Sequence, residues 1–233
     1  PYQIGRKALA VNISDIAAMG GSPTHAVIAV GLPKKRMGTF ARELYRGMSA
    51  LAKRFHVNLV GGDTNASQKV VLSVALLGEV EKGRAVKRSG ACVGDRLFVT
   101  GPLGGSYASK KHLNFIPRVR EAKSLAARLR LHAMMDISDG LGSDARRLAE
   151  ESGVGILLEE SKIPVSRYAR NVRQALTEGE DFELLFAVAP NEVRRAPKGC
   201  YEVGKVVPKK EGLKFLKKDG TKIPLPHVFE HHK

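Results

Sequence analysis

Apolar positions recur at helical spacing in two segments of the first third of the chain, and nearly continuous apolar runs alternate with them. Residues 6–19 and 39–55 place apolar side chains three or four positions apart, which predicts two amphipathic helices. Residues 25–32 and 69–80 are apolar runs of the kind that form buried strands. A shorter strand is expected at residues 57–60, so helices and strands alternate along this part of the chain.

A change in pattern near residue 92 starts a second series of strands and helices that continues to the C-terminus. We therefore predict two domains, residues 1–91 and residues 92–233. Glycine-rich residues 101–106 lack the Lys and Thr of a phosphate loop, so they are interpreted as a helix entry. Strands are expected before residue 88, within residues 93–101, at residues 155–160, after residue 183, and at residues 201–207 and 212–216. Helices are expected at residues 121–131, 142–151 and 164–176.

Length and composition indicate a globular protein. Of its 233 residues 43% are hydrophobic, which is enough for a packed core. The longest apolar runs fall far short of the roughly 20 residues that span a bilayer, so we expect a soluble protein with no membrane partner. Cys92 and Cys200 occur in unrelated contexts that resemble neither a disulfide framework nor a metal site, and a reducing, cytoplasmic location fits them best.

The net charge of +16 raises the question of a nucleic-acid partner, because clustered Lys and Arg bind phosphates without regard to sequence. Here the basic residues are spread over many segments and no aromatic residues lie among them. A bias for solubility or a site for small phosphorylated ligands explains the charge as well. We therefore expect no nucleic-acid partner in the primary role.

Carboxylates follow glycines, serines or strand ends at three places in the sequence. Asp136 and Asp139 flank Ser138 just before a predicted helix, Asp63 follows two glycines, and Asp15 lies on an alanine-rich helix. Such hard oxygen ligands suit Mg²⁺ when substrate phosphates complete its shell. Taken alone, Asp15 could instead be a solvated side chain, and residues 61–65 could be a hairpin turn.

Arg88 lies beside Ser89 and Gly90, and its planar guanidinium is suited to bind a phosphate, although a surface Arg in a turn has the same sequence. A second group of acids, within residues 177–183, precedes a buried strand and must have cations or donors among its members. Magnesium ligands together with an arginine are what phosphoryl transfer requires, because that chemistry consists mostly of positioning and charge neutralisation.

Five of these segments, in this order and at approximately this spacing, resemble the thiamine-monophosphate kinase family. Aminoimidazole ribonucleotide synthetase, selenophosphate synthetase and a hydrogenase maturation factor are sister enzymes of that family, and the last two segments favour the kinase. The resemblance covers the chain from residue 6 onward and is carried by residues 7–20, 61–64, 88–91, 136–141 and 179–184.

The resemblance implies ATP-dependent phosphorylation of thiamine monophosphate to thiamine diphosphate by direct in-line transfer, with several Mg²⁺ ions. It also implies an α/β fold of two parts, in which the N-terminal sheets of two subunits complete a barrel in a homodimer and a C-terminal α+β layer follows. The Mg²⁺ ligands that it implies are Asp15, Asp63, Asp136 and Asp139. The implied nucleotide contacts are Gly62, Arg88, Ser138 and Tyr45, and the implied substrate contacts are Glu180 and Phe229. The catalytic residues that it implies are Asp136, Asp139 and Arg88.

The sequence departs from the family pattern in two ways. A first family segment that supplies further Mg²⁺ ligands is absent, so we expect it to precede the recorded chain. The segment after residue 106 is shorter than usual, and Glu178 stands where the family has glycine. A sister synthetase and a basic nucleic-acid-binding protein are the alternative functions.

Overall fold

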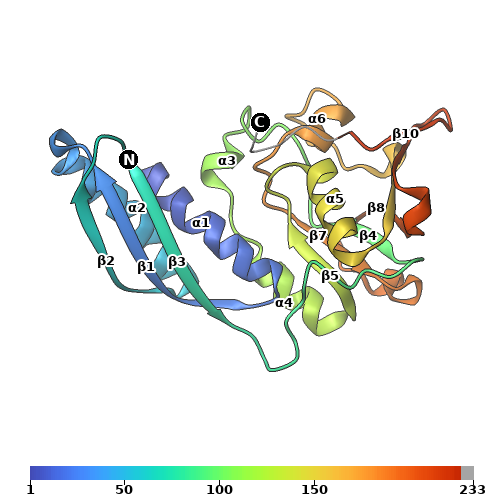
Figure 1. Cartoon of the computed structure of the whole chain (residues 1–233), viewed down its shortest axis with the longest axis horizontal. Helices are drawn as coiled ribbons and strands as arrows, with labels where there is room; N and C mark the ends of the chain where they lie inside the picture. Colours follow the sequence, from blue (N-terminus) through green and yellow to red (C-terminus); the bar gives the residue numbers. More distant parts are fainter. Residues whose placement is uncertain (227–233) are drawn as a thin grey trace.

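Two β-sheets at opposite ends of the molecule form its frame, and helix α1 lies between them in this computed structural model, which describes residues 1–226 (Figure 1). The first sheet has three strands in the order β2-β1-β3. The second has seven strands in the order β10-β9-β6-β8-β4-β7-β5. The structure matches the predicted α/β class.

The N-terminal sheet is covered on one face by two helices. Strand β1 pairs parallel with β2 and antiparallel with β3. No helix within residues 1–226 covers its other face, where Val27 and Leu77 are exposed. The elements of this part are α1 (Tyr2–Ala18), β1 (Ser22–Leu32), the 3-10 turn Lys34–Arg36, α2 (Thr39–Phe55), β2 (Asn58–Ala66) and β3 (Val71–Glu79).

Helices α1 and α2 pack at close range because each presents a glycine to the other. A Cβ on Gly5 would overlap the carbonyl oxygen of Leu44, and a Cβ on Gly47 would overlap that of Tyr2. Only glycine allows two backbones to approach this closely. The contact fixes how the two helices lie over the sheet.

The C-terminal sheet is covered on both faces. Helix α5 packs on one face, and α4 and α1 pack on the other. The elements are β4 (Arg96–Val99), α3 (Lys111–Asn114), α4 (Val119–Arg128), β5 (Leu131–Asp136), α5 (Leu141–Ser152), β6 (Gly155–Glu159), α6 (Val172–Thr177), β7 (Leu184–Val188), β8 (Tyr201–Val207), β9 (Leu213–Leu216), β10 (Lys222–Pro224) and the 3-10 turns Glu160–Lys162, Pro190–Arg195 and Lys209–Glu211.

One hydrophobic core crosses between the two parts. Leu9 and Ile13 of α1 share a buried cluster with Leu51 of α2, Leu125 of α4 and Phe186 of β7. Removing such side chains from water stabilises by roughly 1.5–3 kcal/mol each. Helix α1 therefore fixes the N-terminal part against the C-terminal sheet, and the boundary near residue 92 stays a prediction.

Several predicted elements differ from the structure. Strand β5 was not predicted, and residues 164–176 form a helix only from Val172 onward, where the Asn171 side chain accepts a hydrogen bond from the Gln174 N–H. The hairpin alternative for residues 61–65 is wrong, because β2 continues through them. The strand expected before Arg88 and the helix entry at residues 101–106 do not form. Within residues 1–226, the helices are too short or too polar to cross a bilayer.

Candidate active site

Asp136 is the last residue of β5, and it lies buried against α1. The Ser14 hydroxyl of α1 donates a hydrogen bond to Asp136 Oδ2 over 2.6 Å. Burial raises the pKa of Asp136 to about 6, and the neighbouring Asp15 carboxylate raises it further, while Ser14 and Arg88 act in the opposite direction. A charged carboxylate is costly to bury, and a bound cation lowers that cost. Ser14 was not predicted as a site residue.

Asp15 and Arg88 complete this cluster. Burial raises the pKa of Asp15, and the Arg88 guanidinium lowers it. Because Arg88 acts on both Asp15 and Asp136, all three charges lie within electrostatic reach of one another. The structure therefore brings together three of the residues that the sequence singled out, from α1, from β5 and from the loop after β3.

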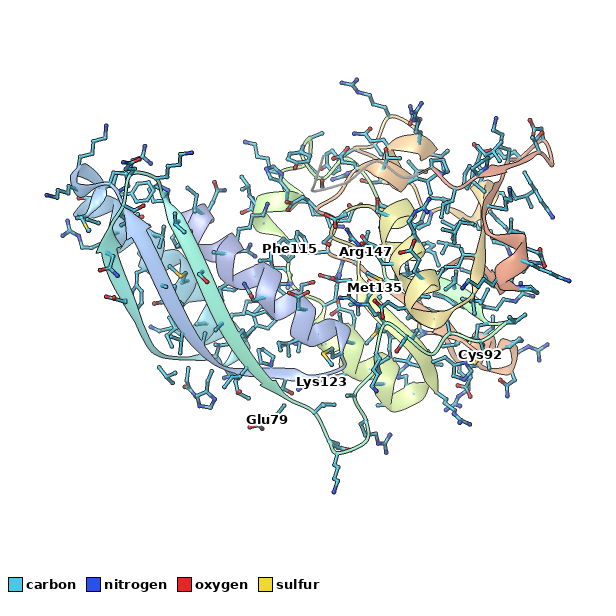
Figure 2. The ribbon with its side chains drawn as sticks, in the orientation of Figure 1. Glu79, Cys92, Phe115, Lys123, Met135 and Arg147 are labelled. Carbon is cyan, nitrogen blue, oxygen red and sulfur yellow. The ribbon has the colours of Figure 1, made fainter. Side chains whose placement is uncertain are left out.

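Asp139 lies where the chain turns from β5 into α5, and two side chains of that helix hold it. Asp144 is fully buried, and its Oδ2 accepts the Asp139 N–H over 3.0 Å. Arg147 donates to Asp139 through the same nitrogen that contacts Asp144 Oδ1 at 2.7 Å. Figure 2 shows Arg147 and Met135 on the side of the C-terminal part that faces α1.

Burial raises the pKa of Asp144 to about 7, against the opposing effects of the Asp139 N–H and Arg147. Asp144 and Arg147 were not predicted as site residues. Their spacing of three positions on a helix is the signal that could have found them, because residues three apart lie on one face.

Backbone hydrogen bonds tie the loop after α6 to the Asp136 segment. The Glu180 N–H donates to the Ser138 carbonyl over 2.7 Å, and the Phe182 N–H donates to that of Ile137 over 2.8 Å. Gly179 leaves no room for a side chain, since a Cβ there would lie 2.5 Å from the Ser138 oxygen. Glu180 has a φ of 72°, and its carboxylate lies 2.6 Å from the ammonium of Lys7.

The acids of this loop have the donors and cations that the sequence required. Glu183 is buried, and burial raises its pKa, but Lys111 and Arg118 outweigh burial and hold it below its ordinary value. Lys111 contacts Glu183 at 2.8 Å and Arg118 contacts it at 2.6 Å. Asp181 accepts the Gly104 N–H over 2.8 Å. These contacts hold the loop in place, and the Glu180 side chain is half-buried beside Lys7.

Asp63, Gly62 and Tyr45 lie at a different place. Asp63 pairs with Ala29 across β1 and β2, so its side chain points to the face of the sheet opposite the helices. There its carboxylate accepts hydrogen bonds from the Asn65 side chain over 2.7 Å and from a backbone N–H over 2.8 Å. The structure does not bring Asp63 to Asp15 within one protomer, since α1 covers the other face.

A cavity of about 320 Å³ lies between α2 and the helix-covered side of the sheet, and Tyr45 of α2 and Gly62 and Asp63 of β2 are among the residues that line it. The predicted Mg²⁺ ligands and nucleotide contacts therefore fall into two sets at separate places in the protomer. One set is Asp15, Arg88, Asp136, Ser138 and Asp139, and the other is Tyr45, Gly62 and Asp63. Phe229 lies outside the described residues.

The comparison with protein families gives two matches. The AIR synthase related protein N-terminal domain matches residues 1–80, and the AIR synthase related protein C-terminal domain matches residues 93–215. The two matched ranges together cover most of the chain.

Curated relatives are thiamine-monophosphate kinases. The chain is 39% identical over 199 residues to that of Rhodopirellula baltica, covering 81% of this chain and 62% of that protein. It is 36% identical over 266 residues to that of Bacillus subtilis, covering 100% and 82%. The chain therefore spans between about three fifths and four fifths of the length of these relatives.

Solved structures give a similar result. The thiamine monophosphate kinase of Aquifex aeolicus has a TM-score of 0.85 at 33% identity, with 96% of this chain and 82% of that chain covered. AaThiL complexed with AMPPCP and TMP has a TM-score of 0.88 at 32% identity, with 100% and 81% covered. The E. coli hydrogenase maturation protein HypE, at 22% identity and a TM-score of 0.84, shares the fold.

Proposed function

We infer the function of this chain from the fact that it belongs to the thiamine-monophosphate kinases, within the AIR synthase related protein family. The proposed reaction is the ATP- and Mg²⁺-dependent phosphorylation of thiamine monophosphate to thiamine diphosphate. Its relative of known structure complexed with AMPPCP and TMP supports both the nucleotide and the acceptor.

The observation that carries the proposal is the meeting of Asp136, Asp15 and Arg88 between α1 and β5. Asp136 is buried beside the more exposed Asp15, and neighbouring carboxylates repel unless a cation lies between them. Oxygen ligands of this kind fit Mg²⁺. When bound, Mg²⁺ would neutralise phosphate charge and align the phosphates for in-line transfer. Arg88 is the group of this cluster that would bind a phosphate directly.

The remaining residues are assigned proposed roles by their positions. Asp139 would hold a second Mg²⁺ position, oriented by Asp144 and Arg147. Ser138 would contact the nucleotide, and Glu180 would contact the thiamine group from the neighbouring loop. Phe229 keeps its predicted role as the stacking residue.

We also propose a homodimer, because Asp63, Gly62 and Tyr45 lie away from the Asp136 cluster in one protomer. A second protomer seated on the helix-free face of the N-terminal sheet would supply Asp63, whereas Tyr45 lies on α2 at the opposite face. The exposed valine and leucine side chains of that face support such an interface. The division into residues 1–91 and 92–233 and the cytoplasmic location are part of the same proposal.

The test measures thiamine diphosphate formed by the purified full-length protein from thiamine monophosphate, ATP and Mg²⁺. Asp136→Asn should lower the turnover by orders of magnitude, while the exposed Asp219→Asn on the β9–β10 turn should leave it unchanged. Undiminished turnover in Asp136→Asn would contradict the site. Turnover of formylglycinamidine ribonucleotide or selenide in place of thiamine monophosphate would identify a sister synthetase instead.

A further inference from the structure

Cys92, Asp95 and His132 form a cluster of potential metal ligands outside the proposed active site. One ligand atom from each residue, the Cys92 thiol sulfur, a carboxylate oxygen and a ring nitrogen, lies within 4.8 Å of the other two. Figure 2 shows Cys92 well apart from Arg147, toward the far end of the C-terminal part. We propose that these three side chains bind a divalent cation of the zinc class.

The turn before β4 holds two of the ligands rigidly. Asp95 is 2% exposed, and its Oδ2 accepts the Cys92 N–H over 2.8 Å. The Asp95 N–H donates in return to the Cys92 carbonyl over 3.0 Å, and the Asp95 carbonyl accepts the Val206 N–H over 2.9 Å. Because the backbone of this turn is hydrogen-bonded on both sides, the thiol and the carboxylate are positioned before any ion binds.

A bulge in β5 directs the third ligand to the same point. The pairing of β5 with β7 shifts register between Leu131 and Ala133, so His132 is the extra residue of the bulge. Bulges redirect a side chain relative to its strand. His132 Nδ1 lies 2.8 Å from the buried Asp95 Oδ2, although β7 separates β4 from β5 in the sheet.

Gly90 allows the loop that carries Cys92 to lie directly against His132 of β5. Its φ is 115°, and a Cβ there would lie 2.7 Å from the His132 carbonyl oxygen. The N–H groups of Gly90 and Ala91 both donate to the Ser152 hydroxyl over 3.2 Å. The loop that carries Cys92 is therefore pressed against β5 and secured to the end of α5.

The donor set selects the class of ion. Thiolate sulfur and imidazole nitrogen suit Zn²⁺ and similar ions, whereas Mg²⁺ takes oxygen ligands. Three protein ligands with an exposed thiol leave a fourth tetrahedral position for water. Without an ion, Asp95 caps its own turn and orients His132, and the Cys92 thiol donates to the Gly90 carbonyl over 3.5 Å; an ion would replace this weak contact of the thiol.

Binding has a defined proton balance. The Cys92 thiol releases one proton to solvent when its sulfur coordinates the ion, and the neutral His132 ring ligates through one nitrogen while its proton stays on the other. The ion would then link the turn before β4 to the edge strand β5. This linkage adds stability in proportion to the logarithm of ion concentration over the dissociation constant.

The experiment titrates the full-length protein with Co²⁺, a spectroscopic substitute for Zn²⁺, in the presence of excess Mg²⁺ to occupy the carboxylate site. Coordination by a thiolate produces an intense sulfur-to-cobalt charge-transfer absorption that carboxylate or histidine ligands alone do not. We expect this band in the unmodified protein, and we expect Zn²⁺ to remove it by displacement. Cys200→Ser, which changes the other cysteine of the chain, should keep the band.

Two variants decide the assignment. Cys92→Ser should abolish the charge-transfer band, and His132→Gln should weaken Co²⁺ binding at least tenfold, while both keep kinase turnover because neither residue lies in the active site. Absence of the band in the unmodified protein at saturating Co²⁺, its persistence in Cys92→Ser, or unchanged affinity in His132→Gln would each overturn the proposal. Because the readout is an absorption band, failure of the proposed kinase activity would leave this test intact.

Discussion

At the scale of single residues, Asp181 is a buried carboxylate whose charge is only partly compensated. Its Oδ2 accepts the Gly104 N–H, whereas its Oδ1 has no hydrogen-bond partner among the described residues and lies 3.6 Å from the Lys111 ammonium. Burial raises the pKa of Asp181 to about 6, against the opposing effects of Lys111 and Gly104. The folded state therefore favours the protonated form more than the unfolded state does.

Between about pH 4 and pH 6 the folded protein binds a proton at Asp181 that the unfolded chain does not, so this contribution to stability is lost as pH rises. Asp181→Asn should remove the effect and keep the acceptor for Gly104. Relative to the wild type, the variant should gain on the order of 3 kcal/mol of unfolding free energy from pH 4 to pH 7. Urea unfolding at several pH values measures this difference, and parallel curves would contradict it.

Arg147 is the residue whose geometry a lysine cannot reproduce. One guanidinium nitrogen contacts both Asp139 and Asp144, and a lysine ammonium, one bond closer to the backbone, does not reach both carboxylates from this position. Arg147→Lys should therefore lower turnover about tenfold and raise the Mg²⁺ concentration needed. Initial rates at varied Mg²⁺ measure both effects. The neighbouring Arg146→Lys is the control, since Arg146 lies 3.9 Å from Glu150, and equal rates in the two variants would refute the role.

The sequence predicted the carboxylates of the site better than the residues that hold them. Asp15, Asp136 and Arg88 were found because charge beside glycine or serine is unusual in a core or an ordinary loop. Ser14 and Asp144 were missed because their importance depends on burial against distant elements, which the local pattern does not contain. The type of a side chain is visible in the sequence, whereas the burial and neighbouring charges that set its pKa depend on residues far along the chain.

At the scale of elements, the contact between α1 and α2 gives a prediction of definite sign. Gly47→Ala should gain about 1 kcal/mol in helix propensity. Its Cβ would however overlap the Tyr2 carbonyl oxygen and force the two backbones apart, so we expect a net loss of about 2 kcal/mol or more. Thermal or urea unfolding measures the loss.

Ser49→Ala is the control for this substitution. Ser49 lies two positions further along α2, is half-buried and already carries a Cβ, so the change removes only its hydroxyl. Its change in unfolding free energy should stay below about 1 kcal/mol. Equal losses in the two variants would show that helix packing is not the cause.

The elements that the sequence missed are those in which tertiary contacts override local propensity. Strand β5 contains Leu131, Ala133, Met134 and Met135, which are good helix formers, and pairing with β7 makes it a strand. The segment before α6 reads as a basic helix, but the Leu103 N–H donates to Pro164 and holds it extended. The amphipathic helix at 39–55, whose pattern spans many turns, was predicted with its observed bounds.

At the scale of the whole molecule, the N-terminal sheet separates two sets of predicted site residues. Asp63 lies on the helix-free face with Val27 and Ala29, while Asp15 lies on the helix that covers the opposite face. Val27 is 47% exposed and Leu77 is 68% exposed, so this face is apolar as well as open. The sequence placed Asp63 and Asp136 in one site, and a single protomer does not bring them together.

A symmetric dimer would resolve this separation if each site combined Asp63 of one protomer with Asp136 of its partner. Asp63→Asn and Asp136→Asn should each be nearly inactive alone. Random mixing makes half of the dimers mixed, and each mixed dimer has one intact site of two. Activity should therefore return to about a quarter of the wild-type level, measured as thiamine diphosphate formed after co-expression with two different affinity tags.

If both aspartates served the same protomer's site, every site in a mixed dimer would carry one substitution, and no activity would return. Mixing Asp136→Asn with Asp139→Asn is the internal control, because these two residues flank one turn between β5 and α5 and cannot complement each other. Recovery in the first mixture and not in the second would show that the active site is shared between protomers. Recovery in neither would place both aspartates in the site of a single protomer, and full activity of Asp63→Asn alone would place Asp63 outside the site.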